Sequence, residues 1–342
     1  MKRYIFSPRV WRAAPRVVNA RAGLCLCRAM IFLAAVLGAV GIFTSAGVAY
    51  TGVSGFDLLA LDGIAGARAA AMGSAHTAEA GDSASLYYNP AGLKDLPRVV
   101  GFTYSKWLAD TGYGAVTYGY KDFAASLAYF DGGLMELNYS NRPSETRIAQ
   151  RDFLLGAGIG RGWLGLGWGI KYLNSSFAEE TTASVVAVDF GRIYEIKPFG
   201  KDMKLGVSMR NLGTGFKQGG KAGSGWILPL YIPTGLIGRY YDYDYLPLQL
   251  RTGLSWSMGD KIKSVNADVI WNINDTTLQL ASGLQYLVSD NVALRAGFKT
   301  GDKLLIITGG LGTRFADKEI DYAFNYNLDL GLLHFVTFSM KL

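Results

Sequence analysis

Beyond Leu96 the chain alternates apolar and polar residues in segments of about ten residues, and this period of two is the feature that most restricts its fold. From Met203 to Asn211, Met, Leu, Val and Met fall on one face, and Lys, Gly, Ser and Arg fall on the other. The pattern recurs, with Ile270 as an exception, in Leu248 to Met258, Val265 to Ile273 and Ile320 to Tyr326. Such alternation is typical of a strand that has lipid on one face and a polar lumen on the other.

The number and length of these segments favour a transmembrane barrel. After Leu96 no apolar run approaches the ~20 residues of a membrane-spanning helix. A soluble β-sandwich would alternate in the same way, but its strands are usually only about five to six residues long. The prediction is an all-β transmembrane antiparallel β-barrel. We expect about fourteen strands, an even number as bacterial barrels require, that begin near Arg98, Ala115, Phe123, Asp152, Leu164, Ser184, Met203, Leu248, Val265, Thr277, Val292, Leu304, Glu319 and Leu332.

The predicted connections differ in length between the two ends of the barrel. The longest, Asp131 to Gln150 and Leu212 to Pro247, both follow odd-numbered strands, whereas turns such as Lys121-Asp122 are short. If the first strand leaves the periplasm, the long connections face outward, as in outer-membrane barrels. The last predicted strand, Leu332 to Leu342, resembles the terminal strand that barrel-assembly machinery recognises, although it ends in Leu instead of an aromatic residue.

Residues 1–49 have the composition of a secretory signal peptide. They contain seven Lys and Arg residues, no acidic residue and an apolar run from Ala29 to Ala46, and Ala49 precedes the expected cleavage site. A retained membrane anchor is the alternative, because this run is at the lower edge of a spanning helix. The whole chain has 34 Lys and Arg against 27 Asp and Glu, so without those seven the charges balance and nothing predicts a nucleic acid partner. Cys25 and Cys27 also lie in this segment, so we expect no disulfide in the mature chain.

The chain offers few residues for catalysis or metal binding. Its histidines are His76, which precedes the strands, and His334, which falls on the apolar face of the last strand, and the spacing assigns a nucleophile to neither. No phosphate-binding glycine motif leads into a lysine. We therefore expect no enzyme, no cofactor and no metal site. Four acidic residues in glycine-rich sequence lack the ligand spacing of a calcium loop, namely Asp57, Asp62, Glu79 and Asp82.

Between the signal and the first strand, residues 50–97 are rich in Ala, Gly and Ser and contain the stretch GARAAAMGSAHTAEAGDSASLYYNPAGLKDL from Gly66 to Leu96. The stretch closes with the tetrapeptide Asn89-Pro90-Ala91-Gly92. Because the residue before a proline avoids the α region, Asn89 can cap a short helix that has Pro90 at its first position. These residues alone also fit an ordinary capped surface helix.

The same stretch resembles the N-terminal hatch of the FadL family of outer-membrane channels, and more closely the PorV/PorQ branch with its spirochaete-type members. The shared pattern is G-x-R-x-x-x-M-G-x-A, a turn rich in acidic or Ser residues, and N-P-A-G-L just ahead of the first strand. The resemblance implies that residues 50–97 form a plug inside a barrel of residues 98–342, in the outer membrane of a diderm bacterium. The matching positions are Gly66, Arg68, Met72, Gly73, Ala75, Asp82, Asn89, Pro90, Ala91, Gly92 and Leu93.

Two further sets of residues bear on how such a barrel would work. The connection between the seventh and eighth strands has an apolar cluster, which in water packs on itself, meets lipid or receives a hydrophobic ligand. Outer loops form the first hydrophobic site in the FadL family, so the resemblance makes this cluster a candidate capture loop: Trp226, Ile227, Leu228, Leu230, Tyr231 and Ile232. Small lumen residues would leave room for a plug, or simply relieve crowding in a curved sheet: Gly156, Gly158, Gly165, Gly167 and Gly169.

The resemblance implies a passive outer-membrane channel for hydrophobic compounds such as long-chain fatty acids, gated by the plug. Its partners would be outer-membrane lipid, an apolar solute and the barrel-assembly machinery. Two alternatives stay open: a PorV-like accessory barrel of a secretion and surface-attachment system, and a structural surface antigen. A continuous apolar path past the plug would favour the channel, and a docking face on the outer loops would favour the accessory barrel.

Overall fold

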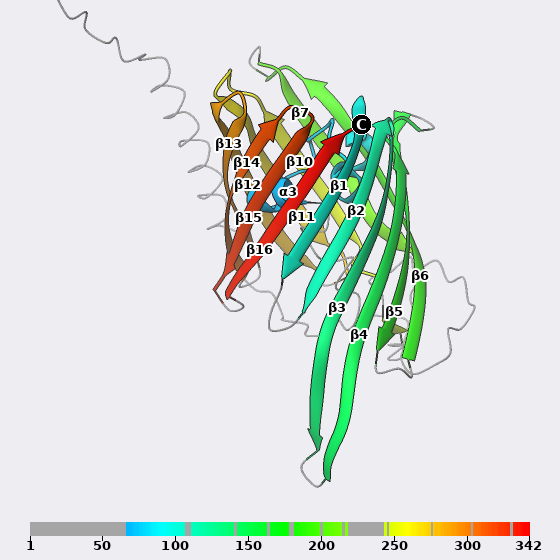
Figure 1. Ribbon diagram of the computed structural model, residues 1–342. Helices are drawn as coiled ribbons and strands as arrows, with labels where there is room; N and C mark the ends of the chain where they lie inside the picture. The colour runs from blue at the N-terminus through cyan, green and yellow to red at the C-terminus, as the bar shows by residue number, and fades with distance from the viewer. Residues whose placement is uncertain are drawn as a thin grey trace, which may run out of the picture. The chain divides into compact units, whose positions relative to one another are not determined.

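The alternating segments form strands that pair around a closed cylinder (Figure 1). The computed structural model describes residues 66–106, 111–139, 142–162, 165–177, 181–198, 201–213, 216–217, 243–244, 246–274, 276–301, 304–328 and 331–342. All of them belong to one unit that spans Thr44–Leu342. The predicted signal peptide, the first part of the predicted plug and the candidate capture loop lie outside the described residues.

Fourteen antiparallel strands make the barrel, which confirms the predicted fold class. Each strand pairs with its neighbours along the chain, β1 pairs with β16 to close the cylinder, and β7 pairs directly with β10. The short strands β8 (Phe216–Lys217) and β9 (Tyr243–Asp244) form a separate two-stranded sheet between them in sequence. The barrel strands are β1 (Leu96–Lys106), β2 (Gly112–Lys121), β3 (Phe123–Tyr139), β4 (Arg142–Ile159), β5 (Gly167–Phe177), β6 (Thr181–Ile196), β7 (Met203–Gly213), β10 (Gln249–Trp256), β11 (Ile262–Asn272), β12 (Thr277–Ser289), β13 (Val292–Gly301), β14 (Leu304–Phe315), β15 (Lys318–Asn327) and β16 (Gly331–Lys341).

In most of the alternating segments named above, the two faces divide as the sequence predicts. On β7, Gly206, Ser208 and Arg210 are buried toward the lumen, while the intervening apolar residues face outward and are partly exposed. Ile270, the exception in the alternation, is fully buried on the lumen side of β11. His334 is exposed on the outer face of β16, where its Nδ1 lies 2.8 Å from the hydroxyl of Tyr322.

The outer face of the barrel is apolar. Large hydrophobic side chains are exposed on almost every strand of the cylinder, including Phe102, Leu127, Leu155, Ile170, Val269, Trp271, Ile307, Tyr322 and Val336. Exposed side chains of this kind in a closed barrel form the lipid-facing band of a membrane-spanning protein. The chain is therefore an outer-membrane β-barrel. Among the described residues, no helix is long and apolar enough to cross a membrane.

Short turns gather at one end of the barrel, the turn end, where the C-terminus is marked in Figure 1. Examples are the turns at Asp122 and at Ala316-Asp317, and near the latter the N–H of Lys341 donates to the carbonyl of Asp317 at 2.8 Å. We call the opposite end, where β3 meets β4 and β7 leads toward β10, the loop end.

The expected loop from Asp131 to Gln150 is wrong in its larger part. Strands β3 and β4 continue through it as a paired ribbon, so β4 begins at Arg142 instead of near Asp152 (Figure 1). The pairing of β2 with β3 ends at Asp131, and that of β5 with β4 ends at Gln150. Polar and charged residues interrupt the apolar positions of this segment, so the alternation stops in the sequence although backbone pairing continues.

Candidate functional site

Residues 66–95, here called the plug segment, lie inside the barrel. They contain α3 (Ala67–Ala71), α4 (Ser85–Tyr88) and the 3-10 turn η1 (Pro90–Gly92). Most of these residues are buried, and their hydrogen-bond partners lie on the lumen side of the strands. Short helices of Ala and Gly suit this place because they pack closely against the wall and form no core of their own.

The barrel supplies hydrogen bonds that α3 is too short to make for itself. The N–H of Ala67 donates to the hydroxyl of Thr337 at 2.8 Å. Thr308 donates from its hydroxyl to the carbonyl of Ala71 at 2.9 Å and accepts from the N–H of Gly73 at 3.0 Å. Both ends of the helix are thus satisfied by wall threonines, as buried helix termini require.

The Asn89-Pro90-Ala91-Gly92 turn has the local structure that the sequence predicts. The side-chain oxygen of Asn89 accepts from the N–H of Ala91 at 3.1 Å, and Pro90 is the first residue of η1. The same amide donates from Nδ2 to the carbonyl of Thr77 at 2.7 Å and to that of Arg192 on β6 at 3.3 Å. Asn89 therefore ties η1 both to the rest of the plug segment and to the wall.

A buried ion pair of the wall holds the turn from Ser74 to Thr77. Asp268 Oδ2 accepts from the backbone N–H groups of His76 and Thr77 at 3.1 and 3.0 Å and from the Thr77 hydroxyl at 2.6 Å. Arg251 donates to the carbonyl of Ser74 at 2.7 Å and lies 3.3 Å from Asp268. Sequence analysis placed both residues on the lumen face and missed their role.

Glycines line the wall where the plug backbone comes closest. A Cβ atom on Gly206 would overlap the carbonyl of Thr77, and one on Gly167 would overlap the N–H of Ala91. At Gly283 it would meet Met72 at 2.5 Å. The expected room for a plug is confirmed at Gly167 and also at Gly158 and Gly169, where the hypothetical Cβ would touch Leu86, Leu93 or Pro90.

One of the five expected lumen glycines does not face the plug. A Cβ atom on Gly165 would meet nothing within 4 Å, and this residue has a φ of 67°. It lies in the turn before β5, where glycine is needed for the left-handed backbone. The expectation for Gly165 is therefore wrong. In the sequence, Gly165, Gly167 and Gly169 alternate without a break, so the pattern does not show that the first of them belongs to a turn and the other two to a strand.

The plug segment carries a charged cluster near the turn end. Arg68 lies 3.5 Å from Asp82 and 3.9 Å from Glu79, and Nε2 of His76 lies 3.7 Å from Asp82. Burial against Tyr88, whose ring centroid is 5.2 Å away, lowers the pKa of His76 below its usual value although the carboxylates oppose this. The ring is therefore neutral near pH 7.

The two carboxyl groups of this cluster ionise readily. Burial is the largest influence and by itself would raise the pKa of Glu79 and of Asp82, but the charge of Arg68 acts together with nearby hydrogen bonds and other positive groups, so that both pKa values lie below their usual range. Two cavities of about 310 and 410 Å³ flank this part of the plug and share Gly81 in their lining. The plug thus presents the paired charges of Arg68 and Asp82 to the cavity that they line.

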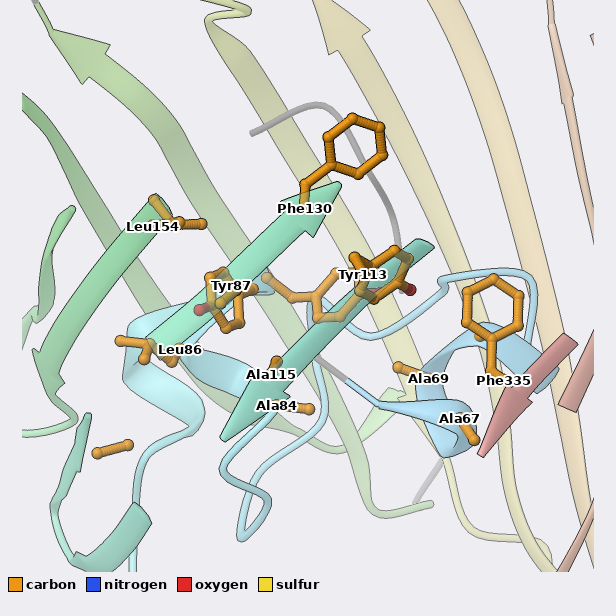
Figure 2. Packing of buried hydrophobic residues seen from close by; sticks show 14 of the residues in the cluster. Ala67, Ala69, Ala84, Leu86, Tyr87, Tyr113, Ala115, Phe130, Leu154 and Phe335 are labelled. Atoms are coloured by element: carbon orange, nitrogen blue, oxygen red, sulfur yellow. The ribbon is translucent and has the colours of Figure 1, made fainter. Parts of the chain in front are cut away.

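An apolar set of side chains, here called the apolar sector, lines the other side of the plug. Leu154, Leu173 and Val185 face one another across β4, β5 and β6, and Tyr113 lies opposite Phe130. Together with Phe335 these residues form one buried cluster with Leu86, Tyr87 and Tyr88 of α4, as Figure 2 shows for several of them. The wall on β10 to β13 turns mainly polar groups inward, with Ile270 as an apolar exception. The buried polar residues there include Gln249, Arg251, Asn266, Asp268, Gln285 and Arg295.

The apolar sector was not predicted, although the sequence contains a signal for it. Phe130, Leu154 and Leu173 occupy lumen positions of strands whose neighbouring lumen residues are small or polar, such as Ser126 and Lys171. A bulky apolar residue on the polar face of an alternating strand marks a lumen that binds something apolar or contains packed protein. Here such residues gather on one side of the barrel.

No described group of three or more His, Cys, Asp or Glu side chains is placed to hold a metal ion. The candidate capture loop from Trp226 to Ile232 belongs to the part of the chain that is not described, so its role stays a prediction.

Neither a protein-family model nor a curated protein sequence matches the chain. Solved structures do match it. The toluene transporter TbuX of Ralstonia pickettii superposes with a TM-score of 0.55 at 13% identity, covering 82% of this chain and 99% of that one. The toluene transporter TodX of Pseudomonas putida gives 0.56 at 14% identity, covering 81% and 98%. The chain shares their fold. At these identities the likeness extends to the architecture alone.

Proposed function

We propose that this protein is a FadL-like outer-membrane channel for the uptake of hydrophobic compounds, closed by its N-terminal plug segment. The observation that carries the proposal is the apolar sector, because an aqueous pore would have a polar lumen throughout. The barrel buries Phe130, Leu154 and Phe335 beside the plug, where an apolar solute would be removed from water.

The class of solute that we propose follows from the side chains of the apolar sector. Leu, Val, Phe and Tyr side chains bind alkyl chains and aromatic rings by burial, without selecting a charge. Long-chain fatty acids are the first solute to test, because apolar side chains continue from Tyr113 across to Val185. The two similar structures are described as toluene transporters, and such small aromatic compounds are the second solute to test.

The proposed mechanism is passive. An apolar molecule is captured at the loop end, with Trp226 to Ile232 as the candidate first contact, and then enters the apolar sector. Its contacts with α4 shift the plug segment between closed and open arrangements of similar free energy. The Asn89-Pro90-Ala91-Gly92 turn belongs to the moving part, because it follows α4 directly and bonds to the wall only through the Asn89 side chain and close packing.

The test is uptake into liposomes that contain the refolded protein. We expect a labelled long-chain fatty acid, or toluene, to enter faster than in protein-free liposomes. Leu173→Gln should slow uptake because it places an amide in the apolar sector, whereas Leu173→Met keeps the site apolar and serves as the matched control. A deletion of Gly66 to Leu96 should let small polar solutes through as well. Equal uptake with and without protein would contradict the channel.

One structural feature favours the alternative, an accessory barrel for secretion or surface attachment. The ribbon of β3 and β4 beyond Asp131 and Gln150 pairs only within itself among the described strands. Free strand edges are a common means of binding another chain. Stable capture of an exported protein by this ribbon, without solute uptake, would support the accessory role.

A further inference from the structure

Where the plug's turn from Ser74 to Thr77 meets the wall, it contacts a buried ion pair, Arg251 and Asp268. Both wall side chains are at most 1% exposed. The two consecutive N–H groups of His76 and Thr77 point at one carboxylate oxygen, an arrangement that binds anions well. Hydrogen bonds to an ionised acceptor are about twice as strong as those between neutral groups.

Most of the hydrogen bonds to Asp268 Oδ2 come from the plug. Arg251 supplies one contact, at 3.3 Å, while the plug supplies three, at 2.6 to 3.1 Å. The other oxygen of Asp268 has no hydrogen-bond partner. If the plug leaves, this carboxylate keeps only Arg251, and a buried charge with so few partners is costly.

We propose that Arg251 and Asp268 form a latch that holds the plug segment in its closed position and is released when an apolar solute displaces α4. This inference rests on the proposed function for its trigger, but the latch itself is a property of the closed barrel. The latch accounts for the charged pair of Arg251 and Asp268 in a part of the lumen that neutral side chains could have filled.

The structure links the latch to the apolar sector through α4. Tyr87 of α4 belongs to the apolar cluster, and the next residue, Tyr88, stacks on the guanidinium of Arg251 at 5.1 Å from its ring centroid. Asn89 then donates to the carbonyl of Thr77, the residue that Asp268 binds. A solute that moves α4 therefore acts on both sides of the latch.

The test uses a single reporter cysteine in the plug. A chain that begins at Tyr50 has no cysteine of its own, so Ala78→Cys, at a buried position next to the latched turn, reports exposure of the plug to a charged, water-soluble thiol reagent. We expect Asp268→Asn, which keeps the shape of the side chain, to speed labelling about tenfold or more because it weakens several charge-assisted hydrogen bonds. Heat-modifiable electrophoretic mobility verifies that the barrel is closed.

The matched control is a second buried ion pair of the wall. Lys171 and Asp189 are 2.5 Å apart, and Asp189 accepts from the N–H of Asn211 within the wall, although the Lys171 ammonium also lies 5.8 Å from the Tyr87 ring centroid. Asp189→Asn should leave the labelling rate of Ala78→Cys within about twofold of the parent. An equal acceleration by both variants would mean general loosening and would overturn the latch, as would a closed Asp268→Asn barrel that labels at the parent rate.

A third variant keeps the test decisive if Asp268→Asn fails to fold. Thr77→Val lies in the plug and removes the hydroxyl that donates to Asp268 at 2.6 Å and accepts from Arg251 Nε at 3.2 Å, without changing a wall residue. It should speed labelling more in the parent barrel than in Asp268→Asn, since the bond between Thr77 and Asp268 is already weakened there and residues that share a contact are not additive. Labelling needs no solute, so the two proposals can fail separately. If Asp268→Asn speeds labelling but the parent transports no solute, only the proposed function is refuted. If the parent transports solute but Asp268→Asn labels at the parent rate, only the latch is refuted.

Discussion

Single glycine residues decide how closely the plug approaches the wall. Gly206 faces the carbonyl of Thr77 so closely that no Cβ atom fits without a shift of backbone, whereas at Gly156 the hypothetical Cβ would meet only side-chain atoms, of Leu86 at 3.5 Å and of Tyr87 at 3.8 Å. Backbone is harder to displace than the end of a side chain. Equal substitutions at these lumen positions should therefore have unequal costs.

We expect Gly206→Ala to lower the free energy of unfolding by roughly 1–3 kcal/mol through overpacking. Gly156→Ala, the matched control on the same inner face, should change it by less than about 0.5 kcal/mol. Urea titration of the folded protein in detergent measures both. Similar losses of unfolding free energy in the two variants would show that the substitution destabilises the strand itself and not its contact with the plug.

His76 should make the closed plug sensitive to acid. Its pKa in the folded protein lies below the usual 6.5 because the ring is buried, so the unfolded state binds more protons as the pH falls below about 6.5 and stability drops there. Glu79 and Asp82 have lowered pKa values as well, from usual values of 4.5 and 3.8. The stability that these two carboxylates contribute is fully present above their usual pKa values and is lost as the pH falls further, through their lowered pKa values in the folded protein.

We therefore expect the free energy of unfolding to decline between about pH 7 and pH 5 in the parent and to stay nearly flat over that range in His76→Gln. Both proteins should lose stability below about pH 4, where Glu79 and Asp82 accept protons in the unfolded state before they do so in the folded state. Urea titrations at several pH values measure this. A parent curve that is flat from pH 7 to pH 5 would mean that the ring has the same pKa in the folded and unfolded states, as a solvated imidazole does.

At the scale of elements, the turn of Asn89 to Gly92 illustrates local and long-range bonding by one side chain. Its oxygen caps η1, which is a property of neighbouring residues, and its Nδ2 bonds to Thr77 and to Arg192 on β6. The cap follows from the Asn-Pro dipeptide. The two other bonds depend on where the barrel places β6.

Substitutions at Asn89 should separate these bonds. Asn89→Ala removes all of them and should cost about 1–3 kcal/mol of stability, since it also leaves buried carbonyls unpaired. Asn89→Asp keeps the capping oxygen but loses the donor to Thr77, so it should loosen the plug while η1 stays intact. Proteolysis of the plug in the closed barrel, compared with urea stability, distinguishes the two. Identical behaviour of both variants would mean that the bonds donated by Nδ2, and not the cap, account for the contribution of Asn89.

At the scale of the whole molecule, the barrel combines an apolar sector near β2 to β6 with a polar wall near β10 to β13. The ribbon of β3 and β4 extends from the same side as the apolar sector (Figure 1). The wall itself is complete without the ribbon, because β3 and β4 pair with β2 and β5 up to Asp131 and Gln150.

Replacing residues 133–148 with a short Gly-Ser turn should therefore leave a closed barrel with unchanged stability and unchanged solute uptake. Heat-modifiable mobility and the liposome assay measure the two properties. If uptake is lost while the barrel stays closed, the ribbon takes part in solute capture. If only binding of an exported protein is lost, the accessory role is favoured.

The sequence by itself determined the number of barrel strands, the two faces of the most regular strands and the cap at Asn89. These follow from local rules, because lipid on one face enforces a period of two and proline restricts its neighbour. Only the tertiary structure decided that Asp268 binds Thr77, 191 residues away, that Phe130 and Leu154 join one apolar sector, and that β3 and β4 continue past the lipid zone. Such contacts depend on barrel closure and strand register, which bring distant residues together and leave no local pattern.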